Sequence, residues 1–262
     1  MKWLSWRWGL GGALVALVVW YLIGLINTEK PAWQFTRSFA REFSIVSGLY
    51  AIWNLGGRIQ AFGADQAIER GERLWEFQQW IGLPSEDWLQ EMILPSAWLV
   101  KAANIYYAVA HVPAFGAVLL WMFYSHRDSY PAFRTQMALF TGTSLLIQLV
   151  AVAPPRFVDV TGMIDTAIVY NQSVYSALGR ESIGQLQAMP SIHVGWALFV
   201  GVLTLRFASR WWVKVIGVSH AVLTWWVVMV TANHFWMDGI VAAIIMVFWF
   251  SVFWLLGKSR SA

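Results

Sequence analysis

Long apolar runs separated by short polar segments dominate the chain. The strongest runs cover residues 97–124, 135–153, 191–207, 212–232 and 238–257. Each is close to the roughly 20 residues that a helix needs to cross a bilayer. Two runs precede them, at residues 9–26 and, more weakly, at residues 43–61, where Asn54 interrupts the pattern. The pattern predicts an all-α fold, a polytopic bundle of transmembrane helices.

Residues 63–96 have a different character, because acidic side chains recur along them. Within this segment Leu74, Phe77 and Ile81 follow helical spacing, with tryptophans beside them. Such a pattern is typical of an amphipathic helix that lies on a membrane surface.

Prolines mark two further local features. The sequence Pro84-Ser85-Glu86-Asp87 predicts the start of a short helix, with a capping serine and acids in the first turn. Pro113 lies inside the run 97–124 and predicts a kink there.

Composition supports a membrane protein. Of the 262 residues, 58% are hydrophobic and 12% are charged, whereas soluble domains carry about 25% charge. There is no cysteine, which excludes a disulfide framework and a thiolate metal site. The net charge of +4 needs no nucleic acid to explain it, since basic cytoplasmic loops have the same effect.

No repeat or linker divides the sequence, so residues 1–262 are expected to form one integral membrane domain. We assign residues 1–40 to an extra N-terminal helix with a linker, and residues 41–257 to a six-helix core. A cleavable signal peptide is the alternative for residues 9–26, but no small-residue cleavage site clearly follows them.

Loop charges predict the orientation. The loop 206–214 holds three basic residues and no acid, and the loop 125–134 and the C-terminal tail are also basic. By the positive-inside rule all three lie in the cytoplasm, which places 63–96 and 154–190 outside. Alternation also puts residues 1–8 outside, against their own basic charge, so either the first helix is an addition or one early span does not cross.

Three polar motifs stand at the outer ends of predicted spans. They are Pro154-Pro155-Arg156, Pro190-Ser191-Ile192-His193 and the segment from His234 to Asp238. The topology therefore brings them to one face of a multi-pass protein of the cell membrane. This predicts an active site on the extracytoplasmic side.

The chemistry of these residues suits a phosphate group. Arg156 offers a fork that matches phosphate oxygens, and Ser191 stands where free backbone N–H groups of a helix start attract an anion. His234 and Asp238 share one helical face, and a carboxylate on one imidazole nitrogen leaves the other nucleophilic. His193 can then protonate the leaving oxygen.

Further residues are candidates for the substrate pocket. His111 lies beside Tyr107 in the sequence and could line the acceptor pocket with it, although His111 could also be a polar group satisfied inside the bundle; Asn233 directly precedes His234. The loop 154–190 is long and is expected to fold over the site. Its candidates for contact with an acceptor are Tyr170, Tyr175 and Arg180.

Over residues 40–257 the sequence resembles the type 2 phosphatidic acid phosphatase superfamily, especially its inositolphosphotransferase-like branch. Pro190 to His193 matches the Pro-Ser-x-His motif of that superfamily, and His234 to Asp238 matches its His-x3-Asp motif. Pro154 to Arg156 and Tyr106 to His111 resemble motifs of the branch. The resemblance implies a six-helix core and a phosphohistidine intermediate, without a metal or cofactor. It implies His234 as nucleophile, Asp238 as its orienting group, His193 as general acid, and Arg156 and Ser191 as phosphate ligands.

Two departures from the phosphatase members bear on the substrate. Those members place Lys seven residues before the first-motif Arg and Pro after it, where this chain has Leu149 and Phe157. They also place Ser-Arg ahead of the final histidine, where Val227-Val228 stand here. Fewer cations suit a phosphodiester better than a phosphomonoester dianion, which favours transfer of a phospho-headgroup to or from inositol or another polyol or lipid alcohol.

Three other functions need consideration. A simple phosphatase of phosphatidic acid or polyprenyl phosphate would use the same residues. A metal-dependent CDP-alcohol phosphotransferase would need several aspartates along one helix, and no acid follows Asp238 in its run. A non-enzymatic lipid or ion carrier would use the polar residues as a relay. It would transport without turnover, whereas an enzyme would cleave a lipid phosphate in chelator.

The predicted orientation can be tested by labelling, since the chain contains no cysteine. A Ser209→Cys variant in intact cells or sealed right-side-out vesicles should react with an impermeant thiol reagent only after permeabilisation. Labelling from the outside would show the opposite orientation.

Overall fold

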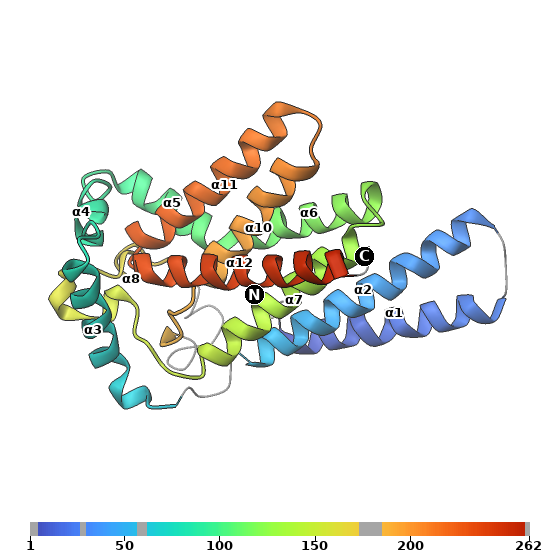
Figure 1. Cartoon of the computed structure of the whole chain (residues 1–262). Helices are drawn as coiled ribbons and strands as arrows, with labels where there is room; N and C mark the ends of the chain where they lie inside the picture. Colours follow the sequence, from blue (N-terminus) through green and yellow to red (C-terminus); the bar gives the residue numbers. More distant parts are fainter. Residues whose placement is uncertain (1–4, 27–29, 57–61, 173–184, 260–262) are drawn as a thin grey trace. The chain divides into compact units, whose positions relative to one another are not determined.

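The computed structural model describes residues 5–26, 30–56, 62–172 and 185–259 (Figure 1). The chain forms two compact units, Met1–Ile59 and Gln60–Ala262. The described residues are mostly helical and contain no named strand, only the isolated bridges Phe62–Val150 and Val152–Gln187. The predicted all-α helical bundle is confirmed.

The first unit is a hairpin of α1, Trp6–Ile26, and α2, Pro31–Gly56. Its helices meet through small side chains, with Ala13 and Ala16 of α1 and Ala51 of α2 buried. The hydroxyl of Ser44 donates a hydrogen bond to the Ala13 carbonyl at 2.9 Å. The polar stretch after the first apolar run is thus mostly helical, as the first turns of α2.

The second unit holds the remaining helices. They are α3 (Ala67–Trp80), α4 (Glu86–Glu91), α5 (Ala97–Val109), α6 (His111–Ser125), α7 (Tyr130–Ile147), α8 (Thr166–Val169), α10 (Ile192–Phe207), α11 (Trp211–Val230) and α12 (Trp236–Ser259). Short 3-10 turns cover Ala64–Gln66 (η2), Pro155–Phe157 (η3) and Asp159–Thr161 (η4).

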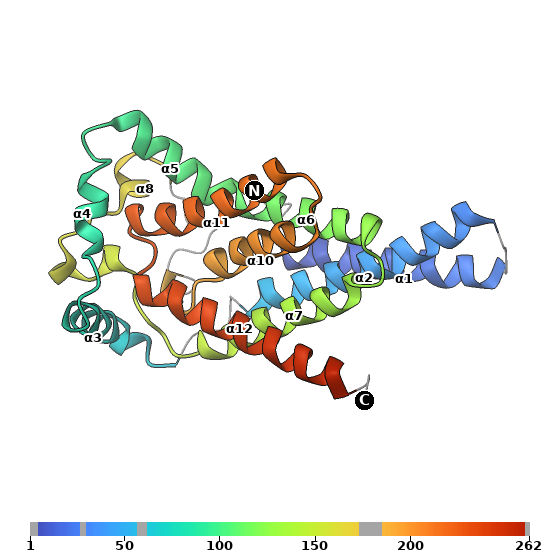
Figure 2. The same cartoon turned by 45° about the horizontal axis from the view of Figure 1, so that its top comes forward.

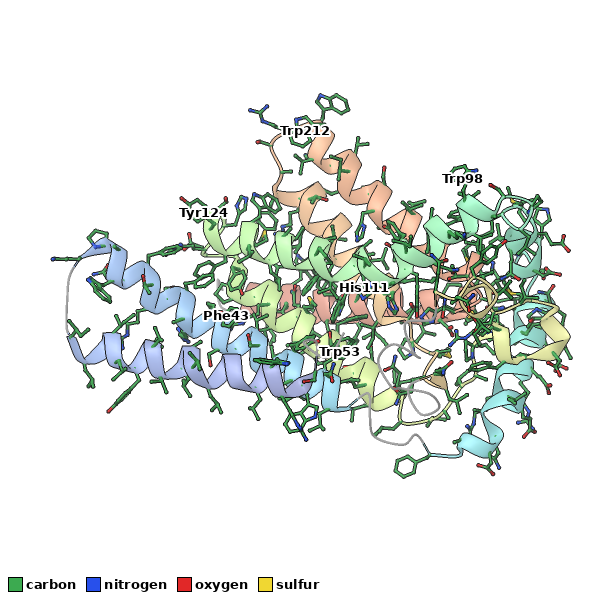
Figure 3. All side chains as sticks on the ribbon, turned by 180° about the vertical axis from the view of Figure 1, so that it is seen from behind. Phe43, Trp53, Trp98, His111, Tyr124 and Trp212 are labelled. Carbon is green, nitrogen blue, oxygen red and sulfur yellow. The ribbon has the colours of Figure 1, made fainter. Side chains whose placement is uncertain are left out.

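Helix α10 is the centre of this unit. It packs against α6, α7, α11 and α12, and most of its side chains are buried. Figures 1 and 2 show α3, α4 and α8 gathered at one end of the unit, beside the start of α12. Figure 3 shows Trp98 and Tyr124, each 73% exposed, on the outside of the unit.

Several helices suit a membrane. In the described part of the chain, α1, α11 and residues Trp236–Leu256 of α12 are long and apolar enough to cross one. The pair α5 and α6 would form a further span, bent by 45°. This bend lies at Ala110, because Pro113 lacks an N–H and its ring clashes with the carbonyl four residues earlier.

The span expected over 135–153 differs from the structure. Helix α7 begins earlier, at Tyr130, and ends at Ile147. Beyond it the backbone pairs with distant segments: the Ala151 N–H donates to Phe62 and the Val152 N–H to Leu186. The last apolar residues of the run therefore form a buried extended segment, which hydropathy alone does not distinguish from helix.

Helix α3 is the expected amphipathic helix, with an inner and an outer apolar side. Leu74 and Trp75 pack inward against a cluster that includes Ala153, Val158 and Phe235. Trp80, by contrast, is 80% exposed. The exposed side suits the interface of a membrane, where tryptophan is enriched.

The close packing of α10 against α7 yields a stability prediction. A Cβ at Gly195 would overlap the ring of Phe140, which is fully buried. Gly195→Ala should destabilise the protein by about 1–3 kcal/mol through overpacking. The measurement is the thermal unfolding midpoint in detergent.

Gly142→Ala is the matched control, since a Cβ there meets nothing within 4 Å. It should be neutral or raise stability by up to about 1 kcal/mol through helix propensity. Equal unfolding midpoints for the two variants would contradict the packing described here.

Candidate active site

The three polar motifs of the sequence meet at the start of α12. The rings of His193 and His234 lie with centroids 5.7 Å apart. The Ser191 N–H donates to the carbonyl oxygen of Asp238 at 3.0 Å. The backbone N–H of Arg156 donates at 3.2 Å to the carbonyl oxygen of Ala232, just before the His234 motif. Motifs spread over about 80 residues of sequence therefore form one site.

His234 and Asp238 form a buried pair. His234 Nδ1 lies 3.1 Å from Asp238 Oδ2, and the two residues are 6% and 0% exposed. A carboxylate only accepts hydrogen bonds, so the proton of the imidazole resides on Nδ1. Nε2 then carries the free lone pair, which is the arrangement that a nucleophilic histidine needs.

Asp238 also closes the N-terminus of its own helix. The same Oδ2 accepts the Phe235 N–H at 2.9 Å, three residues earlier. An acid at the third helical position that reaches back to the residue before the helix is half of a capping box. One carboxylate oxygen therefore fixes both the helix start and the ring of His234.

His193 lies on the first turn of α10 among other rings. Its centroid is 4.6 Å from that of Tyr107 and 4.3 Å from that of His111, which meets it edge-on. His111 stands at the break between α5 and α6, near the middle of the unit (Figure 3). The break thus directs two of the predicted pocket residues, Tyr107 and His111, to the site.

Ser191 is the N-cap of α10. Its Oγ accepts the Val194 N–H at 3.3 Å, and the residue is completely buried. Capping accounts for its place in the sequence. Its hydroxyl still has a proton to donate, so the phosphate-binding role remains a prediction.

Arg156 is held by oxygen atoms on several sides. Its Nε lies 3.2 Å from Asp165 Oδ2, and an Nη atom donates to Asn233 Oδ1 at 2.6 Å. The second Nη lies 3.4 Å from Gln185 Oε1, and the guanidinium stacks over Phe157. The predicted phosphate ligand is therefore oriented before any ligand binds.

Two residues of the loop 154–190, Asp165 and Gln185, make these contacts. The loop also docks on α5, where Thr166 donates to Asn104 at 2.9 Å. Its predicted contact residue Tyr170 packs against the apolar cluster of α4, α5 and α11, beneath Lys101. Tyr175 and Arg180 lie outside the described residues.

Asn233 connects the parts of the site. Its amide nitrogen donates to Thr231 and its amide oxygen accepts from Arg156. Asn233 was predicted as a pocket residue, and the structure gives it a defined task in aligning Arg156.

Sequence reasoning missed two buried polar residues beside α12. Glu86 Oε1 accepts the Trp236 N–H at 2.8 Å, and Gln78 Oε1 accepts the Met237 N–H at 2.8 Å. Burial raises the pKa of Glu86, although the bond from Trp236 acts in the opposite direction. The sequence pattern indicates only that Glu86 is an acid in the first turn of its own helix.

No group of three His, Asp or Glu residues that could hold a metal ion occurs in the described ranges. The chemistry considered below uses the side chains of the chain itself.

The comparisons with known proteins agree with the motifs. A family model described as the PAP2 superfamily matches residues 72–252, which is more than half of the chain. The matched range contains every site residue named above. Neither the comparison with curated proteins nor that with solved structures found a match.

Proposed function

Since the chain belongs to the PAP2 superfamily, we propose that it is an integral-membrane phosphotransferase or phosphatase that forms a phosphohistidine on His234. Membership suggests a membrane enzyme of the lipid phosphatase and phosphotransferase type. The observation that supports His234 most directly is its buried hydrogen bond to Asp238. We place this chemistry on the extracytoplasmic face of the cell membrane, following the loop charges.

The first half-reaction begins with attack of His234 Nε2 on phosphorus. A phosphorus–nitrogen bond forms, the bond to the leaving oxygen breaks, and His193 gives that oxygen its proton. Asp238 stabilises the positive charge that develops on the ring of His234. Arg156 and Ser191 hold the nonreacting phosphate oxygens.

The second half-reaction reverses these roles. A water or alcohol oxygen attacks phosphorus, His193 takes the proton of that hydroxyl, and the phosphorus–nitrogen bond breaks. Water as acceptor gives a phosphatase, and an alcohol such as inositol or a lipid alcohol gives a transferase. Tyr107 and His111, which contact His193, line the expected path of the acceptor.

The charge of the site favours a phosphodiester donor. Arg156 is already paired with Asp165, and its side chain is 2% exposed. Asp238 adds a second carboxylate nearby. A phosphodiester carries one negative charge whereas a phosphomonoester carries up to two, so the diester is repelled less. A phospholipid, whose headgroup is joined through a phosphodiester, is therefore our proposed donor. The motif resemblance favours transfer of an inositol phosphate group as the reaction.

Covalent labelling tests the nucleophile. With a phosphorus-labelled short-chain donor in chelator, the wild-type protein should acquire label that acid removes and base does not. His234→Ala should abolish label and turnover, while Asp238→Asn should reduce turnover by about 10⁴-fold because the tautomer is wrong. His193→Ala should still be labelled by a donor with a good leaving group.

The assignment is reversed if His193→Ala loses the label with such a donor while His234→Ala keeps it. Transport of a lipid or ion by vesicles that show no turnover would instead support the carrier alternative.

Asp165→Asn tests the charge argument. The amide oxygen can still accept the Ile168 N–H and cap α8, while the negative charge beside Arg156 disappears. The ratio of kcat/KM for a phosphomonoester to that for a phosphodiester should rise about fivefold, as expected for an ion pair of about 1 kcal/mol.

Asp159→Asn is the matched control, since this carboxyl group is exposed on the same loop. It should leave the ratio unchanged. A ratio that is the same in Asp165→Asn as in the wild type would remove Asp165 from substrate discrimination.

A further inference from the structure

The first turn of α12 lacks an ordinary cap. The residue before the helix is Phe235, which is completely buried among Ala67, Ala151, Ala153 and Val158. Ser, Thr, Asp or Asn at this position would accept an N–H group of the first turn, but phenylalanine cannot. The N–H groups of Trp236 and Met237 therefore need acceptors from elsewhere.

Glu86 and Gln78 supply these acceptors from two other helices. Each accepts one N–H at 2.8 Å, across 150 and 159 residues of sequence. The Gln78 Nε2 also donates to Glu86 Oε1 at 2.9 Å, which joins the two side chains. Glu86 is 1% exposed and Gln78 is 0% exposed. We call Glu86 and Gln78 the α12 clamp.

The α12 clamp binds the first turn of α12, which also contains Asp238. Asp238 follows Met237 directly, and its Oδ2 must face both the Phe235 N–H and His234 Nδ1. A rotation or fraying of this turn would move Oδ2 away from the imidazole. Small displacements matter here, since misplacement by about 1 Å can cost 100-fold in rate.

We propose that Glu86 and Gln78 are positioning residues, which fix the first turn of α12 so that Asp238 holds His234 in its reactive orientation. This inference rests on the proposed role of His234. It adds two side chains, Glu86 and Gln78, that act on His234 only through Asp238 and do not touch the reacting atoms.

The state of Glu86 fits this task. Desolvation raises its pKa and the nearby charge of Asp238 acts in the same direction. Within the described residues, Glu86 Oε2 and Asp238 Oδ1 are buried oxygens without a hydrogen-bond partner. A neutral carboxyl group accepts the Trp236 N–H without placing a second negative charge beside Asp238. A glutamine should therefore replace Glu86 well.

The test compares Glu86→Leu with Glu86→Gln in the full-length protein. Glu86→Leu should lower kcat by roughly 10- to 100-fold through misplacement, with KM for a short-chain phosphodiester changed less than about twofold. Glu86→Gln should keep kcat within about threefold, because its amide oxygen accepts the same two hydrogen bonds. Hydrogen–deuterium exchange of the Trp236 and Met237 amides should be faster than in the wild type in Glu86→Leu, and unchanged in Glu86→Gln.

Ile93→Ala is the control for a general loss of stability. Ile93 is 1% exposed in the neighbouring apolar cluster, and the truncation should cost about 2–5 kcal/mol of stability. Its kcat at low temperature should equal that of the wild type. If Glu86→Leu does not fold, Gln78→Leu serves in its place. It should likewise lower kcat and speed hydrogen–deuterium exchange at Met237.

An unchanged kcat in the leucine variant, or an equal loss in Glu86→Leu and Glu86→Gln, would overturn the inference. So would unchanged exchange at the first turn. The exchange measurement does not involve chemistry at phosphorus, so it separates the two proposals. Turnover retained in His234→Ala would refute the proposed function, while slow exchange in Glu86→Leu would refute the clamp.

Discussion

The arrangement of the site depends on the hydrogen bonds that one carboxylate oxygen accepts. Asp238 Oδ2 accepts both the Phe235 N–H and the proton on His234 Nδ1. The start of α12 and the ring of His234 are therefore held by the same atom, so a shift of one would disturb the other. The Asp238 carbonyl adds a third link, since it accepts the Ser191 N–H at the start of α10. The site is thus a junction of two helix N-termini rather than a pocket lined by independent side chains.

Other elements of the second unit converge on this junction. The break at Ala110 directs Tyr107 and His111 to the ring of His193, and the segment after α7 delivers Arg156. The long loop supplies Asp165, which orients Arg156 and offsets its charge. Arg156, partly neutralised by Asp165, and the buried carboxylate of Asp238 suit a monoanionic phosphate better than a dianionic one. This physical character, together with PAP2 superfamily membership, underlies the proposal of a lipid phosphodiester donor.

The sequence predicted those features that depend on local spacing. Apolar runs predicted the helices of the bundle, and the interval of four between His234 and Asp238 predicted their contact. The helix predicted over 135–153 is too long at its C-terminal end, because the last residues of this run form extended bridges. Apolar side chains suit a buried extended segment as well as a helix. Glu86 and Gln78 could not be foreseen, since their partners lie about 150 residues away and no periodicity connects them. Asp165 was missed for the same reason, because its contact with Arg156 depends on the path of a loop.

Transfer through a covalent phosphohistidine differs from direct transfer in the stereochemical course at phosphorus, and this difference can be measured. The donor is a short-chain phosphodiester made chiral at phosphorus, and the acceptor is an alcohol or isotopically labelled water. Each in-line displacement inverts the configuration, so two successive displacements through His234 predict a product with net retention. Net inversion would mean a single direct transfer to the acceptor, without a covalent intermediate on His234.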